Sequence, residues 1–399
     1  MIIPHRAQRR LALAIAAPAA LLLASCAALS TWLPSWVTTP PWAGPESRKI
    51  APLPAFDAKA TARVNWQIPL GGKGNVGFVP AIRGNAIYAA GQDGDVVSVD
   101  SATGQPRWRT GVSKALSGGV GADDATVVAG TNKAEVLAFD ASGKPLWQTK
   151  VSSEVSGPPQ VAEGIVAVWS LDGRIYGLSA TDGSRKWVYQ RTNPPLTVRR
   201  FTGGVITRGA LFTGSAGGKL LGIDLASGAL GWEGNVTTPK GATELERLAD
   251  ITSLPAVDAR QVCAAAYQGR VACFDVTRGT LLWSRDIGSL GGIALDNRYL
   301  YIADDKGAIQ ALDKTTGASV WKQDKLVGRY PSGPVVISDY LAVVDAEGYL
   351  HLLDRNDGAL VGRVATDGKA ALSQPAAAGD AAIWQSASNL ISASASAAK

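Results

Sequence analysis

A short pattern that returns along the chain from residue 61 onward limits the fold more than any other feature of the sequence. In most copies an aspartate is followed after two or three residues by a glycine, and a tryptophan stands four positions beyond that glycine. The copies end at Trp108, Trp147, Trp187, Trp232, Trp283 and Trp321, and a seventh copy, Asp354 to Gly358, lacks the tryptophan. The tryptophans lie roughly 40 to 50 residues apart, a spacing typical of propeller blades or of open repeat arrays.

Each repeat unit predicts a four-stranded antiparallel sheet. Alternating runs such as 96–99 and 136–139 precede the aspartate and predict strands with two distinct faces. Pairs such as Asp93-Gly94 come before these runs and favour hairpin turns, because glycine adopts positive φ at little cost. We expect the aspartate to accept backbone hydrogen bonds in the next turn. We expect the tryptophan to open the outermost strand and to pack between neighbouring sheets.

The two ends of the repeat region complement each other. The segment 63–68, which contains Trp66, resembles only the last strand of a unit, whereas 381–384 and 389–391 resemble only the earlier strands. Pairing these ends completes one more blade and removes exposed sheet edges. The sequence therefore predicts an all-β fold, a single eight-bladed β-propeller of four-stranded antiparallel blades over residues 61–399. An open array of stacked sheets is the alternative.

Residues 1–25 have the pattern of a bacterial lipoprotein signal peptide. Three arginines precede the apolar run 11–23, which is too short to span a bilayer comfortably. Small residues lead up to Cys26, so we expect Cys26 to be the lipidated first residue of the mature chain. An ordinary signal peptide with a chance cysteine is the alternative. Ala27, in place of the aspartate that marks inner-membrane retention, favours the outer membrane.

Residues 26–60 differ in character from the repeats and predict a tether. Prolines recur through this segment and disfavour regular structure. Trp32, Trp36 and Trp42 stand between the prolines. They either belong to a plain disordered tether or lie at the level of the lipid headgroups, where amphipathic rings partition well.

Charge and residue usage exclude several classes of function. Removal of the leader lowers the formal net charge from +6 to +3, which gives no case for a nucleic-acid surface. His351 is the one histidine after the leader, so a His-based metal site or catalytic triad lacks its parts. The glycine-rich run 71–74 lacks the Lys-Ser/Thr ending of a phosphate loop. We therefore expect no catalytic residue, no metal site and no cofactor.

Cys263 and Cys273 flank a turn at Gln268-Gly269, and their state depends on the length of that turn. A two-residue loop puts the two side chains on opposite faces of the hairpin, whereas a three-residue loop with a bulge puts them opposite each other. An oxidising compartment permits a disulfide. Two buried thiols and a cross-strand disulfide both stay open, and the sequence favours the thiols.

The Asp-x-x-Thr/Ser-Gly-x-x-x-Trp repeat resembles that of pyrroloquinoline-quinone-type propellers. With the lipobox at Cys26, the chain over residues 61–395 resembles the BamB family, the lipoproteins of the outer-membrane β-barrel assembly machinery. Two segments outside the repeat carry the more specific likeness, 194–199 and 241–252. The resemblance implies that these two loops lie together on one face and dock on a periplasmic POTRA domain of the barrel subunit BamA.

The resemblance also assigns candidate partner-binding residues. Leu196, Val198 and Arg199 match the family's Leu-x-Leu-Arg motif, with valine for the second leucine. Asp250 and Thr252 match its Asp-x-Asp motif, with threonine in place of the second carboxylate. Apolar anchors would exclude water while the arginine donates paired hydrogen bonds to the partner. In the alternative interpretation, Leu196 and Val198 are strand residues entering the fourth blade, and Asp250 pairs with an arginine of its own chain.

The resemblance implies a scaffold and not an enzyme. The expected protein is anchored to the outer membrane, faces the periplasm, binds BamA and assists the folding and insertion of outer-membrane proteins, with unfolded substrates as further partners. A quinoprotein dehydrogenase is the alternative within the fold, but such enzymes typically carry a calcium site and often adjacent cysteines. The cysteines of this chain are not adjacent. A lipoprotein that binds peptidoglycan or surface polysaccharide is the other alternative.

Overall fold

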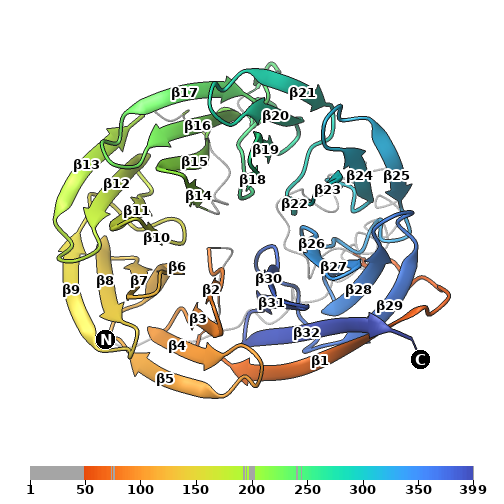
Figure 1. Ribbon diagram of the computed structural model, residues 1–399, viewed down its shortest axis with the longest axis horizontal. Helices are drawn as coiled ribbons and strands as arrows, with labels where there is room; N and C mark the ends of the chain where they lie inside the picture. Colours follow the sequence, from red (N-terminus) through yellow and green to blue (C-terminus); the bar gives the residue numbers. More distant parts are fainter. Residues whose placement is uncertain are drawn as a thin grey trace, which may run out of the picture. The chain divides into compact units, whose positions relative to one another are not determined.

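The computed structural model describes residues 49–398, apart from 73, 75, 76, 192, 193, 195, 197–202, 240 and 244. The unit that starts at Ile50 is a ring of blades around a central axis (Figure 1). Within the described residues the strands form eight four-stranded antiparallel sheets. The predicted eight-bladed, all-β propeller is therefore confirmed. The described part of the chain contains no helix that is long and apolar enough to cross a membrane.

Seven blades each use four consecutive strands, with the first strand next to the axis and the fourth at the outer edge (Figure 1). The strands of blades 1 to 4 are β2 (Ala81–Arg83), β3 (Ala86–Ala90), β4 (Asp95–Asp100), β5 (Pro106–Gly111); β6 (Leu116–Ala122), β7 (Thr126–Thr131), β8 (Glu135–Asp140), β9 (Pro145–Lys150); β10 (Gln160–Ala162), β11 (Ile165–Trp169), β12 (Arg174–Ser179), β13 (Arg185–Gln190); β14 (Gly204–Thr207), β15 (Ala210–Ser215), β16 (Lys219–Asp224) and β17 (Leu230–Asn235). Those of blades 5 to 7 are β18 (Ala256–Val257), β19 (Gln261–Ala265), β20 (Val271–Asp275), β21 (Leu281–Arg285); β22 (Gly292–Leu295), β23 (Tyr299–Ala303), β24 (Ile309–Asp313), β25 (Ser319–Gln323); β26 (Val335–Ile337), β27 (Tyr340–Val344), β28 (Tyr349–Asp354) and β29 (Leu360–Ala365).

The eighth blade joins the two ends of the repeat region, as the sequence predicts. Its strands are β30 (Ala376–Ala378), β31 (Ala381–Gln385), β32 (Asn389–Ala397) and, at the outer edge, β1 (Ala60–Pro69). β1 pairs antiparallel with β32, so that Trp66 lies opposite Ser392 and Ile68 opposite Leu390. The ring is closed, and the open array is excluded.

The repeat motif forms the turn between the third and fourth strands of a blade. In blade 1 the Asp100 carboxylate accepts the backbone N–H groups of Ala102 and Thr103, both at 3.1 Å. Gly104 then adopts a φ of 71°, in the left-handed region that favours glycine. These local hydrogen bonds make the turn a property of the motif itself.

Tryptophans join neighbouring blades in a repeated arrangement. Each one lies over the motif glycine of the next blade, and a Cβ on Gly143, for example, would come within 2.6 Å of the Trp108 ring. Its Nε1–H donates to a carbonyl oxygen of the same turn, over distances of 2.8–3.3 Å. The pairs are Trp66 with Ser101, Trp108 with Ala141, Trp147 with Ala180, Trp187 with Leu225, Trp232 with Val276, Trp283 with Lys314 and Trp321 with Arg355.

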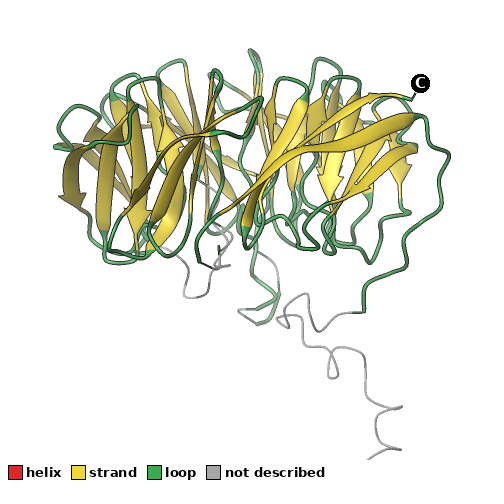
Figure 2. Ribbon diagram, turned by 90° about the horizontal axis from the view of Figure 1, so that it is seen from below, coloured by secondary structure: helices red, strands yellow, loops and turns green. Residues whose placement is uncertain are grey.

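The propeller has two faces, which carry different turns and links. The motif face carries the repeat turns and the turns between first and second strands. The link face carries the turns between second and third strands and the links from one blade to the next. In Figure 2 the motif face is at the top, where β32 ends, and the link face is at the bottom.

Candidate partner-binding face

The predicted contact residue Leu196 lies on the link face, in the link from β13 to β14. Its side chain is 43% exposed. Pro194 of the same link approaches blade 4, because a Cβ on Gly217 would lie 3.9 Å from the Pro194 Cγ atom. The predicted residues Val198 and Arg199 lie outside the described residues, as does Cys26.

The second predicted segment meets the first one through Gly217. This glycine belongs to the turn between β15 and β16, and its N–H donates to Asp250 Oδ1 at 2.9 Å. Asp250 is in the long link from β17 to β18 and is only 5% exposed. One turn of blade 4 is therefore close to Pro194 of the first link and bonded to Asp250 of the second, on the same face of the propeller.

The burial of Asp250 and Thr252 changes the roles that the sequence predicts for them. Thr252 is 1% exposed, and its hydroxyl donates to the Ser289 carbonyl at 3.4 Å. The Asp250 carbonyl accepts the Tyr267 N–H at 3.0 Å from the neighbouring turn of blade 5. Side chains this deeply buried do not offer a surface to a partner. They attach the link to blades 4 and 5, which agrees with the alternative of an intramolecular role for Asp250.

A short turn within the same link presents an exposed leucine. The Glu246 carboxylate accepts the backbone N–H groups of Ala242 at 2.8 Å and Thr243 at 3.1 Å. The Thr243 hydroxyl accepts the Glu246 N–H at 3.3 Å, so the two residues satisfy each other's backbone as in a capping box. The hydrogen bonds from the Thr243 and Ala242 backbone lower the pKa of Glu246. Leu245 projects from this turn and is 56% exposed.

A third exposed leucine on this face has no signal in the sequence. Leu171 lies in the turn between β11 and β12, and its N–H donates to the Glu154 carbonyl at 2.8 Å. Its side chain is exposed, as are those of Leu196 and Leu245. These three leucines come from blade 3, the link to blade 4 and the link to blade 5, which follow one another around the ring. We call them the leucine surface.

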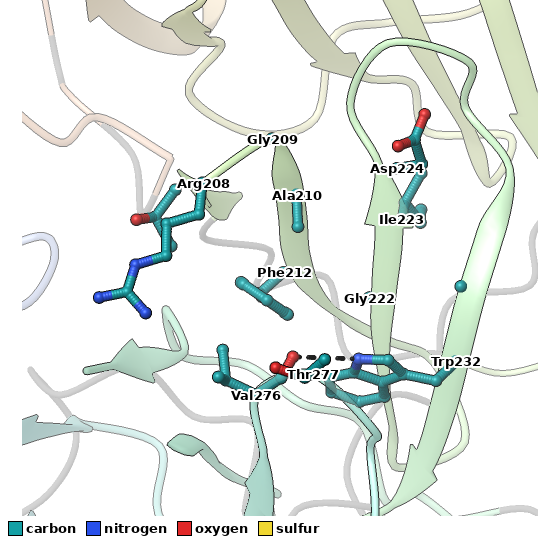
Figure 3. Close-up of a pocket in the computed structure, with 12 residues that line it drawn as sticks. Arg208, Gly209, Ala210, Phe212, Gly222, Ile223, Asp224, Trp232, Val276 and Thr277 are labelled. Atoms are coloured by element: carbon teal, nitrogen blue, oxygen red, sulfur yellow. Dashed lines mark hydrogen bonds between the residues drawn. The ribbon is translucent and has the colours of Figure 1, made fainter. Parts of the chain in front are cut away.

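A cavity of about 310 Å³ lies on the other side of the molecule, between blades 4 and 5 (Figure 3). Ala210 and Phe212 of β15 form one wall, and Trp232 with Val276 form another. Ala210 is opposite Asp224 in its blade, the position that Tyr299 holds opposite Asp313 in blade 6. A small side chain at that position leaves the space open. The cavity is beside the motif face, away from the leucine surface.

His351, the histidine that follows the apolar N-terminal run, belongs to a buried charged cluster in blade 7. His351 Nε2 lies 2.8 Å from Asp345 Oδ2, and Arg329 Nε donates to the same oxygen at 2.7 Å. Burial opposes the charged carboxylate, but hydrogen bonds from His351, the Tyr349 backbone and Arg329 outweigh it, so the pKa of Asp345 is lowered. No group of three potential metal-ligating residues occurs in the part of the chain that the structure describes.

Cys263 and Cys273 form a disulfide across strands β19 and β20. Ala266 N–H donates to the Arg270 carbonyl at 2.9 Å, which leaves three residues in the loop, and Gln268 adopts the left-handed conformation with a φ of 47°. This loop places the cysteines directly opposite each other, with Cα atoms 4.0 Å apart. The two free thiols that the sequence favours are not what the structure contains, because the turn is the longer of the two alternatives.

The blade repeat and the closed ring define the class of the protein as a propeller built from pyrroloquinoline-quinone-like repeats. A family model described as outer membrane protein assembly factor BamB matches residues 53–115 and 92–323. The chain belongs to the BamB family. It is 42% identical to the assembly factor BamB of Nitrosomonas eutropha over 325 residues, which cover 81% of this chain and 80% of the relative.

Further relatives agree with this assignment. The BamB of Bordetella pertussis is 37% identical over 82% of this chain and 85% of its own. The crystal structure of BamB from Moraxella catarrhalis superposes with a TM-score of 0.76 at 25% identity, covering 84% of this chain and 99% of that one. A quinohemoprotein alcohol dehydrogenase from Pseudomonas putida has a TM-score of 0.63 at 12% identity, covering 88% of this chain and 79% of its own, and shares the fold alone.

Proposed function

We propose that this chain is a non-enzymatic scaffold of the outer-membrane β-barrel assembly complex. It is anchored to the outer membrane through lipidated Cys26, faces the periplasm and binds a POTRA domain of BamA with its link face. In that position it assists the folding and insertion of outer-membrane proteins and meets their unfolded chains. Membership of the BamB family supports this role, because the relatives are named as outer membrane protein assembly factors.

One observation carries the choice of face. The two links that depart from the repeat both approach the turn at Gly217, which lies near Pro194 of the first link and is hydrogen-bonded to the Asp250 carboxylate of the second. Beside them, Leu196 and Leu245 expose apolar side chains on the same face. Exposed apolar side chains are the usual anchors at the centre of a protein interface, because they lose water on binding.

We divide the predicted residues into two groups. Leu196, Val198 and Arg199 contact the partner directly. Asp250 and Thr252 act through position, because their side chains hold the second link against blades 4 and 5. Thr252 stands where the family has a second aspartate. Because the Thr252 side chain is buried, this exchange costs no contact with the partner.

The decisive experiment measures binding of purified BamA POTRA domains to the chain by biolayer interferometry. Replacing Leu196 and Arg199 together with alanine should weaken binding at least about 30-fold, since a hot-spot residue contributes about 2 kcal/mol or more. Leu146→Ala is the matched control, because this leucine is similarly exposed but lies on the outer strand β9. Unchanged affinity of the double variant would remove the site assignment while leaving the fold intact.

The absence of enzymatic activity is also part of the proposal. The dehydrogenase neighbour is 12% identical, whereas the assembly factors reach 42% over most of the chain. A likeness confined to the fold does not carry an active site with it. Incubation with pyrroloquinoline quinone and Ca²⁺, followed by a dye-linked dehydrogenase assay over a set of alcohols, should give no reduction above background. Sustained turnover would establish the enzymatic alternative.

A further inference from the structure

The residues just before the first strand lie on the propeller and not away from it. We call 50–59 the strap. It runs along the outer edge of blade 7 from the link face to the motif face, where β1 begins (Figures 1 and 2). At the link face, the Ala51 N–H donates to the Gly328 carbonyl at 3.1 Å. At the motif face, the Lys59 N–H donates to the Val361 carbonyl at 2.9 Å.

Blade 7 receives the start of β1 and the strap through two neighbouring residues. Gly362 stands four positions after the motif glycine Gly358, where the other repeats have tryptophan. A Cβ on Gly362 would lie 2.8 Å from the Ala60 carbonyl oxygen, so the incoming chain uses the space that a side chain would need. Next to it, Arg363 donates to the Pro54 carbonyl at 3.1 Å, and its guanidinium lies 5.1 Å from the centre of the Phe56 ring.

A buried arginine holds the far end of the strap. Arg329 is 1% exposed, and its Nη1 donates to the Ala51 carbonyl. Its other nitrogens donate to Asp345 Oδ2 at 2.7 Å and to Glu347 Oε2 at 2.5 Å. A buried guanidinium is stable only where its donors are satisfied in a fixed geometry, so its site favours one position of the strap.

The position of the strap decides where the preceding chain leaves the propeller. With the strap docked, the chain arrives at Ala51 on the link face. Without it, the first fixed residue is Ala60 at the motif face, where it pairs with Ala397. We propose that Arg329 and the strap direct the membrane-attached N-terminal segment to the link face, so that the link face, and not the motif face, is turned toward the membrane. This inference rests on the lipid attachment in the proposed function.

The test measures orientation on vesicles of phosphatidylethanolamine and phosphatidylglycerol, using the full lipidated protein. A donor dye is attached to Lys133→Cys on the link face or to Asp124→Cys on the motif face. Both positions are exposed turns of the same blade. Energy transfer to an acceptor lipid should be higher from position 133. Equal transfer from the two positions, or higher transfer from 124, would overturn the proposal.

Variants that release the strap test the cause of the orientation. Arg329→Met removes the clamp, and Phe56→Ala is a milder change that leaves the buried cluster in place. In both, the Ala51 and Lys59 amides should lose protection from hydrogen exchange, and the difference between positions 133 and 124 should be lost. Arg278→Met, at an exposed turn of blade 5, is the control and should change neither. A difference that persists after the strap is released would contradict the proposal.

The outcomes separate this inference from the proposed function. Failure of the wild-type protein to float with vesicles would overturn the lipid attachment and the orientation together. Flotation with equal energy transfer overturns the orientation alone. POTRA binding in solution should be kept by Arg329→Met and lost by the variant of Leu196 and Arg199. The reverse pattern would show that the strap serves partner binding and not orientation.

Discussion

The boundary between blades 7 and 8 differs from the others in the described ring. At seven boundaries a tryptophan of one blade packs on a motif glycine of the next and donates to a carbonyl of the same turn. At the boundary of blades 7 and 8 there is no such turn, because β32 and β1 come from opposite ends of the chain. A tryptophan there would have nothing to pack on, and Gly362 lies against the Ala60 carbonyl of β1 instead. The seventh copy of the motif therefore lacks its tryptophan at the boundary where the chain supplies no motif turn for the ring to pack on.

The largest effect should come from removing a tryptophan at a regular boundary. Trp187 is buried against Gly228 and donates to the Leu225 carbonyl at 2.8 Å. Trp187→Ala should lower the free energy of unfolding by about 3–5 kcal/mol, the usual cost of the cavity and the lost burial. Urea denaturation followed by fluorescence measures this loss. Trp108→Ala should cost less, because that indole is only partly buried; an equal loss would contradict the role of burial.

A similar loss should follow in blade 7 from a change that involves no tryptophan. Asp345→Asn leaves the buried Arg329 with weaker compensation and should lower the free energy of unfolding by about 3 kcal/mol. The same denaturation experiment gives the value. Asp124→Asn, at an exposed turn, is the control and should change stability by less than about 0.5 kcal/mol. A loss that small for Asp345→Asn would show that the cluster does not stabilise blade 7.

Two glycines with the same backbone conformation separate strain from packing. Gly317 has a φ of 68° and Gly379 a φ of 62°. A Cβ on Gly317 would lie 2.4 Å from the Trp283 ring, whereas one on Gly379 would have nothing within 4 Å. Gly379→Ala should therefore cost about 1–2 kcal/mol from backbone strain alone. Gly317→Ala should cost at least about 1 kcal/mol more, since the ring must move; equal melting temperatures would contradict this difference.

The smallest effect concerns acid and the carboxylates of the motif turns. Hydrogen bonds from Arg107 and Thr103 lower the pKa of Asp100 to about 2, and those from Ser184 lower the pKa of Asp182 to about 2. Because the folded pKa lies below the unfolded value of about 3.9, these groups stabilise the fold above that pH. Their contribution should be lost as the pH falls from about 4 toward 2. Urea midpoints across this range should show a smaller change for Asp182→Asn than for the wild type.

Much of the fold follows from short-range chemistry that the sequence displays directly. The motif turn needs only an aspartate, the next few amides and a glycine at positive φ, so the spacing of the motif predicts seven blades, and the complementary ends of the repeat region predict the eighth. The turn at Gln268 shows the limit of such reasoning. Its glycine suggests the left-handed residue, but Gln268 takes that conformation, and the longer loop changes the state of Cys263 and Cys273.

The candidate face was only partly predictable, because its details depend on distant contacts. Asp250 looks like a surface carboxylate until the Gly217 N–H is placed against it. The strap resembles the rest of a proline-rich tether in sequence, since Arg329 holds it from 278 positions away in the chain. Leu171 belongs to no motif, and only the turn between β11 and β12 puts it on the same face as the other two leucines of the leucine surface.

The pairing of β1 with β32 also sets an order of events during biogenesis. Asn65 and Ser394 hydrogen-bond across a sequence separation of 329 residues. β1 is synthesised first, and it can pair only after β32 has been synthesised. Until then, blades 7 and 1 each leave uncovered the apolar face that packs on blade 8, and contacts this distant in sequence form slowly. Closure is therefore the final folding step, and a stop codon before residue 389 would leave β1 without its partner and the ring unable to seal.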